Sequence, residues 1–196
     1  MFTINPCAAG CRKPAITGSN LCFTHQANPQ QETARICDYI GENQTINDLN
    51  VTGMRFENAD FSTRCFYGCD FRETSFVRCS FSGATFRMGF FDFAGFSNCD
   101  FTKSDIQFVS FAGVFFRNCS FEGSEIVHVN FGGASVFDTS FNNSNLYNSR
   151  FISANLQKST FVNCNLKRVY FVDVKQKDIL FKSSNTAEAV FEMEKQ

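Results

Sequence analysis

The chain has 196 residues, a formal net charge of −1 and no Trp, and 27 of its residues are Phe. The repeat region described below carries 13 acidic and 13 basic residues, which excludes a polybasic surface and a strongly anionic one. No apolar run reaches membrane-spanning length, and the first residues lack the apolar core of a secretory leader. We therefore expect a cytoplasmic protein without membrane contact.

Residues 1–27 differ in composition from the rest and contain a motif typical of metal ligands. Cys7 and Cys11 form one close pair, and Cys22 and His25 form a second one after a short loop. Such pairs can place three thiolates and one imidazole tetrahedrally around zinc. The stretch also resembles the small zinc knuckles attached to various phage and bacterial proteins. We predict a closed, structural zinc site, and a disulfide or unrelated thiols are the alternatives.

The next segment, 28–45, predicts a helix near 29–40 and a linker. Asn28 suits the N-cap, Pro29 the first helical position, Gln31 completes a capping box, and Gly41 suits the C-terminal stop. The expected apolar side consists of Ala34, Ile36, Tyr39 and Ile40. We expect this helix to cap the first coil of the repeat.

From Phe56 to Phe171, every fifth residue is apolar. Of these 24 positions eighteen are Phe, and the others are Ile106, Ile126, Val136, Leu146, Leu156 and Leu166. A period of five fits neither a helix nor a strand, but a chain that turns a corner every five residues keeps all these side chains inside. Because the aliphatic exceptions recur at intervals of 20, four sides should close one coil, and residues 20 apart should stack.

A small residue precedes most of these apolar positions by two, as in Ala59-Asp60-Phe61, Cys99-Asp100-Phe101 and Ala154-Asn155-Leu156. This pattern resembles the pentapeptide-repeat family, over about 46–181. The resemblance implies an all-β, right-handed, four-sided solenoid. The pattern decays at Gln176, and residues 182–196 are expected to form a C-terminal capping or dimerisation helix through Val190, Phe191 and Met193.

Five of the ten Cys residues occupy the small position of the repeat: Cys69, Cys79, Cys99, Cys119 and Cys164. There a thiol acts as a slightly larger Ala. Stacked thiols would be prone to oxidation outside the cell, which again favours a reducing cytoplasm.

No catalytic motif is found, and we predict that the protein is not an enzyme. The chain has no Gly-rich phosphate loop and no nucleophile elbow, and His128 is its only His outside the metal motif. Asp60 and Asp100 lie two coils apart, too far for an acid/base pair, so they should bind turn backbone.

One outward surface is unusually apolar for a solenoid. Its residues are Met88, Phe90, Phe93, Phe108 and Tyr147. Such a patch marks an interface with a partner protein or a second copy, whereas the alternative is that some rings of a Phe-rich chain fold back over the corners.

Three functions stay open from the sequence. The first is a non-enzymatic scaffold or protein-binding module with a zinc-ordered N-terminus. The family resemblance implies the second, a DNA mimic that modulates type II topoisomerases, but the balanced charge and the register without inserted loops do not match it. The third is nucleic-acid binding through Arg12 and Lys13 of the zinc segment, which two cations alone do not favour.

Overall fold

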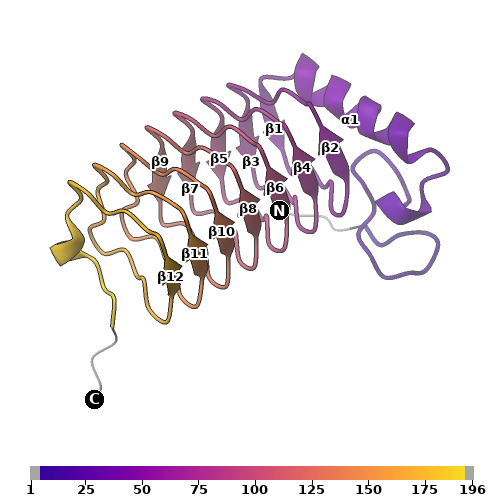
Figure 1. Ribbon diagram of the computed structural model, residues 1–196. Helices are drawn as coiled ribbons and strands as arrows, with labels where there is room; N and C mark the ends of the chain where they lie inside the picture. The colour runs from indigo at the N-terminus through magenta and orange to yellow at the C-terminus, as the bar shows by residue number, and fades with distance from the viewer. Residues whose placement is uncertain (1–4, 193–196) are drawn as a thin grey trace.

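The structure is a computed structural model that describes residues 5–192. A small N-terminal segment and helix α1 (Pro29–Glu42) precede a rod in which the chain winds coil upon coil, about seven times, to the C-terminal end (Figure 1). Two one-turn helices lie outside the rod's strands, η1 (Phe23–His25) and η2 (Thr186–Glu188). The predicted four-sided solenoid is confirmed.

Two parallel sheets form opposite sides of each coil. The five-stranded sheet has the order β1 (Thr45–Asn47), β3 (Cys65–Tyr67), β5 (Thr85–Arg87), β7 (Asp105–Gln107) and β9 (Glu125–Val127). The seven-stranded sheet runs from β12 (Lys175–Lys177) through β11 (Asn155–Gln157), β10 (Ser135–Phe137), β8 (Phe115–Arg117), β6 (Gly95–Ser97) and β4 (Ser75–Val77) to β2 (Arg55–Glu57). Paired residues are 20 apart, as in Phe66 with Phe86, and single bridges of the same spacing form the two remaining sides.

The corners explain the period of five. Between Asp48 and Ser183 every fifth residue has a positive φ, which turns the chain after each short side. Most of these residues are Gly, Asn or Asp, the types that tolerate the left-handed region best. Each side therefore starts again with its central residue pointing inward, so the 24 predicted inward residues can all face the axis.

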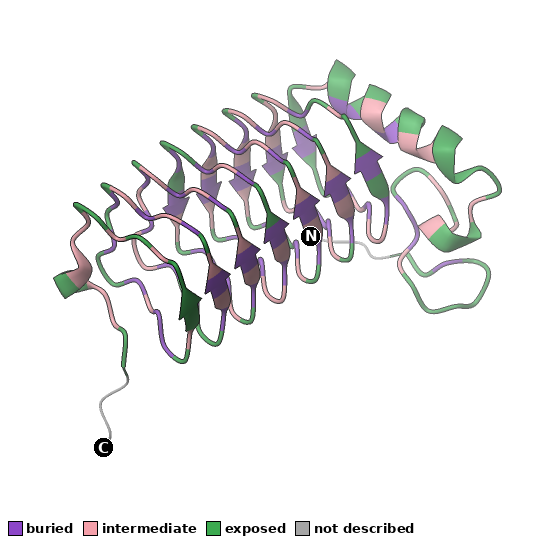
Figure 2. Cartoon of the chain, viewed as in Figure 1, coloured by how far each residue is buried: buried purple, intermediate pink, exposed green. Residues whose placement is uncertain are grey.

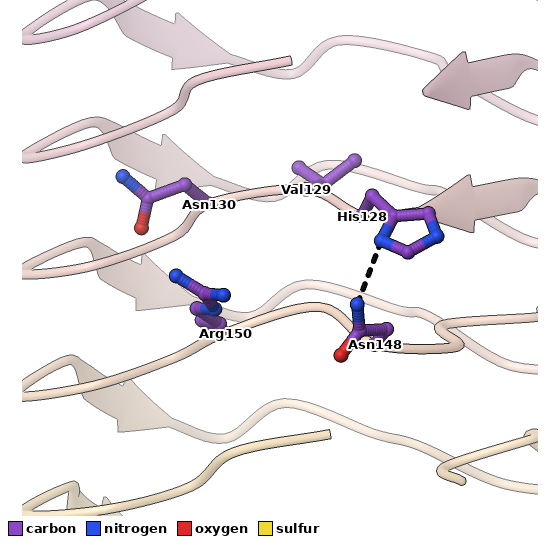
Figure 3. Close-up of a pocket in the computed structure, with 5 residues that line it drawn as sticks. All are labelled: His128, Val129, Asn130, Asn148 and Arg150. Atoms are coloured by element: carbon purple, nitrogen blue, oxygen red, sulfur yellow. Dashed lines mark hydrogen bonds between the residues drawn. The ribbon is translucent and has the colours of Figure 1, made fainter. Parts of the chain in front are cut away.

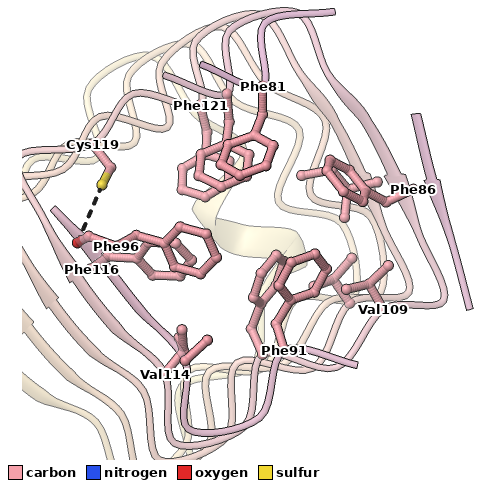
Figure 4. Packing of buried hydrophobic residues seen from close by; sticks show 14 of the residues in the cluster. Phe81, Phe86, Phe91, Phe96, Val109, Val114, Phe116, Cys119 and Phe121 are labelled. Atoms are coloured by element: carbon pink, nitrogen blue, oxygen red, sulfur yellow. Dashed lines mark hydrogen bonds between the residues drawn. The ribbon is translucent and has the colours of Figure 1, made fainter. Parts of the chain in front are cut away.

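All 24 are buried, with at most 2% of their surface exposed. Their rings stack between coils: the centroids of Phe81 and Phe101 are 4.6 Å apart, as are those of Phe101 and Phe121. Rings on adjacent sides meet edge to face, as Phe116 and Phe121 do at 5.2 Å (Figure 4). Figure 2 shows buried residues within the strands along the rod, except in β12, which is exposed. Each buried Phe contributes ~1.5–3 kcal/mol of gross stabilisation.

Helix α1 covers the N-terminal end of the rod. Asn28 caps it, because its side chain accepts a hydrogen bond from the Gln31 N–H at 3.1 Å. Ile36 and Ile40 are buried against the first coil, whereas Ala34 and Tyr39 are exposed, so the predicted apolar side was partly wrong.

The predicted stop at Gly41 was also wrong, since the helix continues to Glu42. Two side chains outside the helix satisfy its last carbonyls. The Asn43 amide donates to the Tyr39 carbonyl at 2.7 Å, and the Arg64 guanidinium donates to the Gly41 carbonyl at 2.9 Å. Because Arg64 comes from the next coil, the helix end is fixed by the rod and needs no left-handed glycine.

The C-terminal end differs from the sequence prediction of a helix over 182–196. Among residues 182–192, which the structure describes, only Thr186–Glu188 is helical, and Val190 then pairs with Tyr170 as another side of the rod. The Phe171 N–H donates to the Val190 carbonyl at 2.7 Å, and the Phe191 ring stacks on Phe171 at 5.4 Å. Met193 lies outside the described residues. Gln176 is exposed on β12, in agreement with the predicted break in the inward series.

The five cysteines of the small repeat position are buried, and each thiol lies near a backbone carbonyl of the previous coil. Burial raises the pKa of the Cys69 thiol to about 12, and the neighbouring Cys119 thiol raises the pKa of Cys99 to about 12. Both thiols therefore stay protonated at neutral pH, and the thiol form is a poor nucleophile.

We expect these five thiols to resist alkylation in the native protein at pH 8. Intact-protein and peptide mass spectrometry after treatment with N-ethylmaleimide should show Cys69, Cys79, Cys99, Cys119 and Cys164 unmodified. All five should react in guanidinium chloride, which is the control for reagent and accessibility. Rapid modification of Cys99 in folded protein would contradict the buried, protonated state.

Candidate functional site

The N-terminal segment is a compact loop structure without a core of its own. An antiparallel bridge joins Pro6 and Pro14, and the Cys7 N–H donates to the Lys13 carbonyl at 2.9 Å. The Gly10 N–H closes a tight turn on the Cys7 carbonyl at 3.0 Å. Because of this turn, Cys7 and Cys11 lie beside each other.

The second pair of residues is positioned by η1, which directly follows Cys22. The His25 N–H donates to the Cys22 carbonyl at 3.0 Å, so a single helical turn brings the imidazole beside the Cys22 thiol. The two pairs then meet across the loop. The ligand atoms of Cys7, Cys11, Cys22 and His25 all lie within 4.8 Å of one another.

The distances within this cluster match a tetrahedral set. The Nδ1 atom of His25 is 3.4 Å from the Cys7 sulfur and 3.5 Å from the Cys22 sulfur, and the sulfurs of Cys11 and Cys22 are 3.6 Å apart. Tetrahedral zinc with ordinary bond lengths would require edges of ~3.5 Å between sulfur and nitrogen and ~3.8 Å between two sulfurs. The four residues could therefore hold one metal ion, and they leave no fifth position among themselves.

The electrostatic setting of Cys7 favours its thiolate. Its pKa is lowered to about 6, first because the backbone N–H of Cys22 is directed at the sulfur and further because of His25. A deprotonated thiol is the form that ligates metals.

The segment is attached to the rod and to α1. Ile16 is 1% exposed and belongs to the continuous apolar core. The Thr17 N–H donates to the Asn50 carbonyl at 3.0 Å, and the Asn50 amide donates to the Ala15 carbonyl at 2.8 Å. Arg35 of α1 donates to the Thr17 carbonyl at 2.5 Å. The cluster is thus held in a fixed place above the first coil.

A second candidate site is the aromatic face, the name used here for Met88, Phe90, Phe93, Phe108 and Tyr147. Met88, Phe90 and Phe93 belong to one coil and lie between β5 and β6, on a side that joins the two sheets. Met88, Phe93 and Phe108 are exposed by 60%, 72% and 58%, and Phe90 by 40%. Tyr147 lies farther along the rod and is half-buried, with its hydroxyl accepting from Arg168 at 3.1 Å.

Two of these rings rest on residues of the next coil. Phe108 stacks on His128, with centroids 5.0 Å apart and planes 7° apart. The Phe93 ring lies over Gly113, where a Cβ atom would come within 2.6 Å of the ring. Gly113 has a φ of +63°, and a side chain at this corner would have to displace the Phe93 ring.

Sequence reasoning missed the backbone conformation at these corners and the residues below the face. Met88, Phe93 and Phe108 all have positive φ. A pocket in the following coils is lined by Asn148 and Arg150, which come 20 residues after His128 and Asn130 of the same pocket. This spacing of 20 was the sequence signal that could have identified it.

The two acidic residues that were considered for chemistry serve the turns. Asp60 Oδ1 accepts from the Ser62 N–H at 2.9 Å, and Asp100 Oδ1 accepts from the Thr102 N–H at 2.8 Å. Within residues 5–192, no helix is both long and apolar enough to cross a membrane.

Comparison with known proteins agrees with this architecture. The model of the "Pentapeptide repeat region" family matches residues 49–131 and 114–191. No curated protein sequence matches the chain. Among solved structures, QnrB1, a plasmid-mediated fluoroquinolone resistance protein, matches with a TM-score of 0.59 at 22% identity, over 71% of each chain. HetL, a pentapeptide repeat protein involved in heterocyst differentiation regulation from the cyanobacterium Nostoc sp. strain PCC 7120, matches with a TM-score of 0.36 at 12% identity, over 80% of this chain and 95% of its own.

The likeness to QnrB1 shows the fold alone. The family model, in contrast, covers most of the chain and begins and ends close to the coils seen in the structure. The stacked inward rings, the coil of 20 residues and this match together show that the chain belongs to the pentapeptide-repeat family.

Proposed function

We propose that the protein is a non-enzymatic protein-binding module. Its solenoid would present the aromatic face to a partner protein, and its N-terminal segment would be ordered by a structural zinc ion. The observation that carries the proposal is that large apolar side chains occupy exposed corners whose backbone conformation disfavours them.

The energetic argument compares corners of the same rod. A left-handed conformation costs a residue with a Cβ ~1–2 kcal/mol, and Asn and Gly reduce this cost. Asn98, Asn118 and Gly113 follow that preference. Where the rod departs from it, most residues are polar, as at Glu73 and Lys103, whereas Met88, Phe93 and Phe108 are large and apolar. Since these three side chains are also mostly exposed, they gain little from burial within the chain. A contribution to binding accounts for both features.

Zinc in the N-terminal segment is proposed from the donor set. Three thiols and one imidazole at tetrahedral spacing suit zinc, and four protein ligands leave no position for a reacting water. The segment spans residues 5–27 and buries only a few apolar side chains, so it needs such a crosslink to be ordered. The thiols of the cluster and the repeat also support a reducing, cytoplasmic location.

A DNA-mimic role at a type II topoisomerase is the second candidate, because QnrB1 shares the fold and is described as a resistance protein. The balanced charge of the rod does not resemble a duplex, which carries one negative charge per ~1.7 Å. A DNA-supercoiling assay with added protein separates the two functions, since a binding module of the proposed kind leaves the topoisomerase unaffected.

Replacing Phe108 by Asn tests the proposal, because Asn is the residue preferred at this corner. We expect a melting temperature equal to or above that of the wild type, and at least ~10-fold weaker association with the partner, since ~1.4 kcal/mol corresponds to that factor. Partners captured by the immobilised protein would be quantified by mass spectrometry, and the affinity for a purified partner would be measured by titration.

Leu180→Asn is the matched control, because Leu180 is 48% exposed but lies on another side of the rod. It should leave partner capture unchanged. If Phe108→Asn keeps the association, or lowers the melting temperature strongly, Phe108 has a structural role and the proposal fails. Loss of self-association instead, measured by analytical ultracentrifugation, would identify the partner as a second copy.

A further inference from the structure

A pocket of about 170 Å³ lies beside the aromatic face. It is lined by His128, Val129, Asn130, Asn148 and Arg150, from two successive coils (Figure 3). Val129 is buried at its floor, and the other four side chains are polar and surround the opening. The stack of Phe108 on His128 makes this pocket continuous with the aromatic face.

The pocket holds a guanidinium group without an acidic partner. Among residues 5–192, no carboxylate lies within ion-pair distance of Arg150. Two charged groups on the adjoining side of the rod already have partners: Lys167 pairs with Glu188 at 3.7 Å, and Glu125 accepts from Asn145 at 2.7 Å. The Arg150 guanidinium can therefore bind a ligand without breaking an ion pair.

The hydrogen bonds around Arg150 leave amide donors free. Asn130 uses its carbonyl oxygen to accept from the Gly132 N–H at 3.0 Å, so its Nδ2 group remains available. Asn148 donates one Nδ2 hydrogen to His128 Nδ1 at 2.7 Å and keeps the other. His128 adds a ring wall to the pocket, and Arg150 supplies its permanently charged group.

We infer that this pocket binds the carboxylate of an Asp or Glu side chain in a partner segment whose flanking apolar residues pack on the aromatic face. The inference deepens the proposed function and rests on it. A guanidinium fork with neighbouring amides matches a monoanionic carboxylate, whereas a phosphate dianion would keep an unneutralised charge beside one cation.

The charges of the same side favour a foreign segment over a second copy. Two of its acidic residues nearer the N-terminus already have partners within the chain, since Asp70 pairs with Arg72 at 2.6 Å and Asp92 accepts from Ser110 and from the Ala112 N–H. Toward the C-terminus the side carries Arg150 and Arg168, and its acidic residue Asp173 lies at the far corner. An acidic segment would complement this end without displacing an internal ion pair.

The test uses synthetic peptides and the full chain. Fluorescent nine-residue peptides with a central Glu or Asp between Leu and Phe residues would be titrated and followed by fluorescence polarisation. Matched peptides would carry Gln, Asn or phosphoserine at the centre. We expect the acidic peptides to bind, the amide peptides to bind at least 10-fold more weakly, and phosphoserine to give no gain.

Arg150→Gln should weaken acidic-peptide binding at least 10-fold and leave amide-peptide binding unchanged. The control is Arg117→Gln, which removes the same charge from the seven-stranded sheet, where Arg117 lies over the Phe115 ring. It should not alter binding. Thermal melts of both variants would confirm that the rod is intact.

The outcomes separate this inference from the proposed function. If Phe108→Asn weakens binding but Arg150→Gln does not, the aromatic face is an interface and the carboxylate pocket is wrong. Equal binding of acidic and amide peptides, tighter binding of the phosphopeptide, or no peptide binding at all would also overturn the pocket. If neither variant changes binding, both proposals fail.

Discussion

Phe101→Asp should prevent the chain from folding. Phe101 is fully buried, and its ring stacks on Phe81 and Phe121, each at 4.6 Å, with edge contacts to Phe96 and Phe116 at 5.2 and 6.2 Å. Removing a buried Phe ring alone costs ~3–5 kcal/mol, and domains have only ~5–15 kcal/mol of stability. The Asp carboxylate adds the cost of a buried charge without a partner.

Far-UV circular dichroism and size-exclusion chromatography would measure this effect. Phe101→Leu is the matched control, because Leu146, Leu156 and Leu166 occupy the same inward series. It should fold, with a loss of about 1–2 kcal/mol. A soluble Phe101→Asp variant with the β signal and melting temperature of the wild type would show that the inward column does not hold the rod together.

Removing the proposed zinc ion should disorder the N-terminal segment and leave the rod folded. Zinc bound by the four ligands would join the two halves of that segment, and structural zinc contributes ~10–16 kcal/mol of apparent binding energy in small domains. The rod, by contrast, is held by its own inward rings and by hydrogen bonds between coils. Cys22→Ser should therefore abolish zinc binding while the β signal persists.

Loss of the zinc ion should also lower the stability of the rod by a measurable amount. Ile16 is buried against the first coil, so disorder of the segment would expose it and the apolar residues below it. We expect a loss of ~1.5–3 kcal/mol, the value of one buried aliphatic side chain, confined to the first coil. Hydrogen exchange followed by mass spectrometry, with and without a chelator, should show faster exchange in residues 5–27 and near Asn50, and little change beyond Phe101.

Cys65→Ser is the control, since Cys65 lies half-buried on β3 outside the cluster. Its zinc content, measured by elemental analysis, should equal that of the wild type. Protein purified without chelators that contains no zinc would refute the metal site. A disulfide between any two of Cys7, Cys11 and Cys22 in protein kept under reducing conditions would refute it equally.

The metal cluster itself was predictable from sequence spacing. A pair of ligands three or four residues apart can face one point on a tight turn, and here Gly10 and η1 form those turns. What spacing did not indicate is where the cluster lies. Its place follows from Ile16 and Asn50, which attach the loop to the first coil and which belong to no recognisable motif.

The sequence alone determined the architecture of the rod. A period of five with an apolar centre leaves one way to bury every repeated ring, and the recurrence at 20 identifies which residues stack, as Phe66 with Phe86 and Ile106 with Ile126 confirm. The N-cap at Asn28 was also readable, because a cap is a local contact between residues three apart.

Only the tertiary structure decided the ends and the outer surface. The C-terminal segment pairs with Tyr170 because the preceding coil offers free backbone groups, and local helix propensity cannot compete with that edge. Helix α1 ends at Glu42, where Arg64 of a later coil donates to the Gly41 carbonyl. The pocket at Arg150 likewise depends on which neighbours leave its guanidinium unpaired. The five-residue repeat determines the inward positions, because only apolar side chains can be buried in the core of the rod. The arrangement of the outer side chains depends on contacts between coils, which the repeat does not specify.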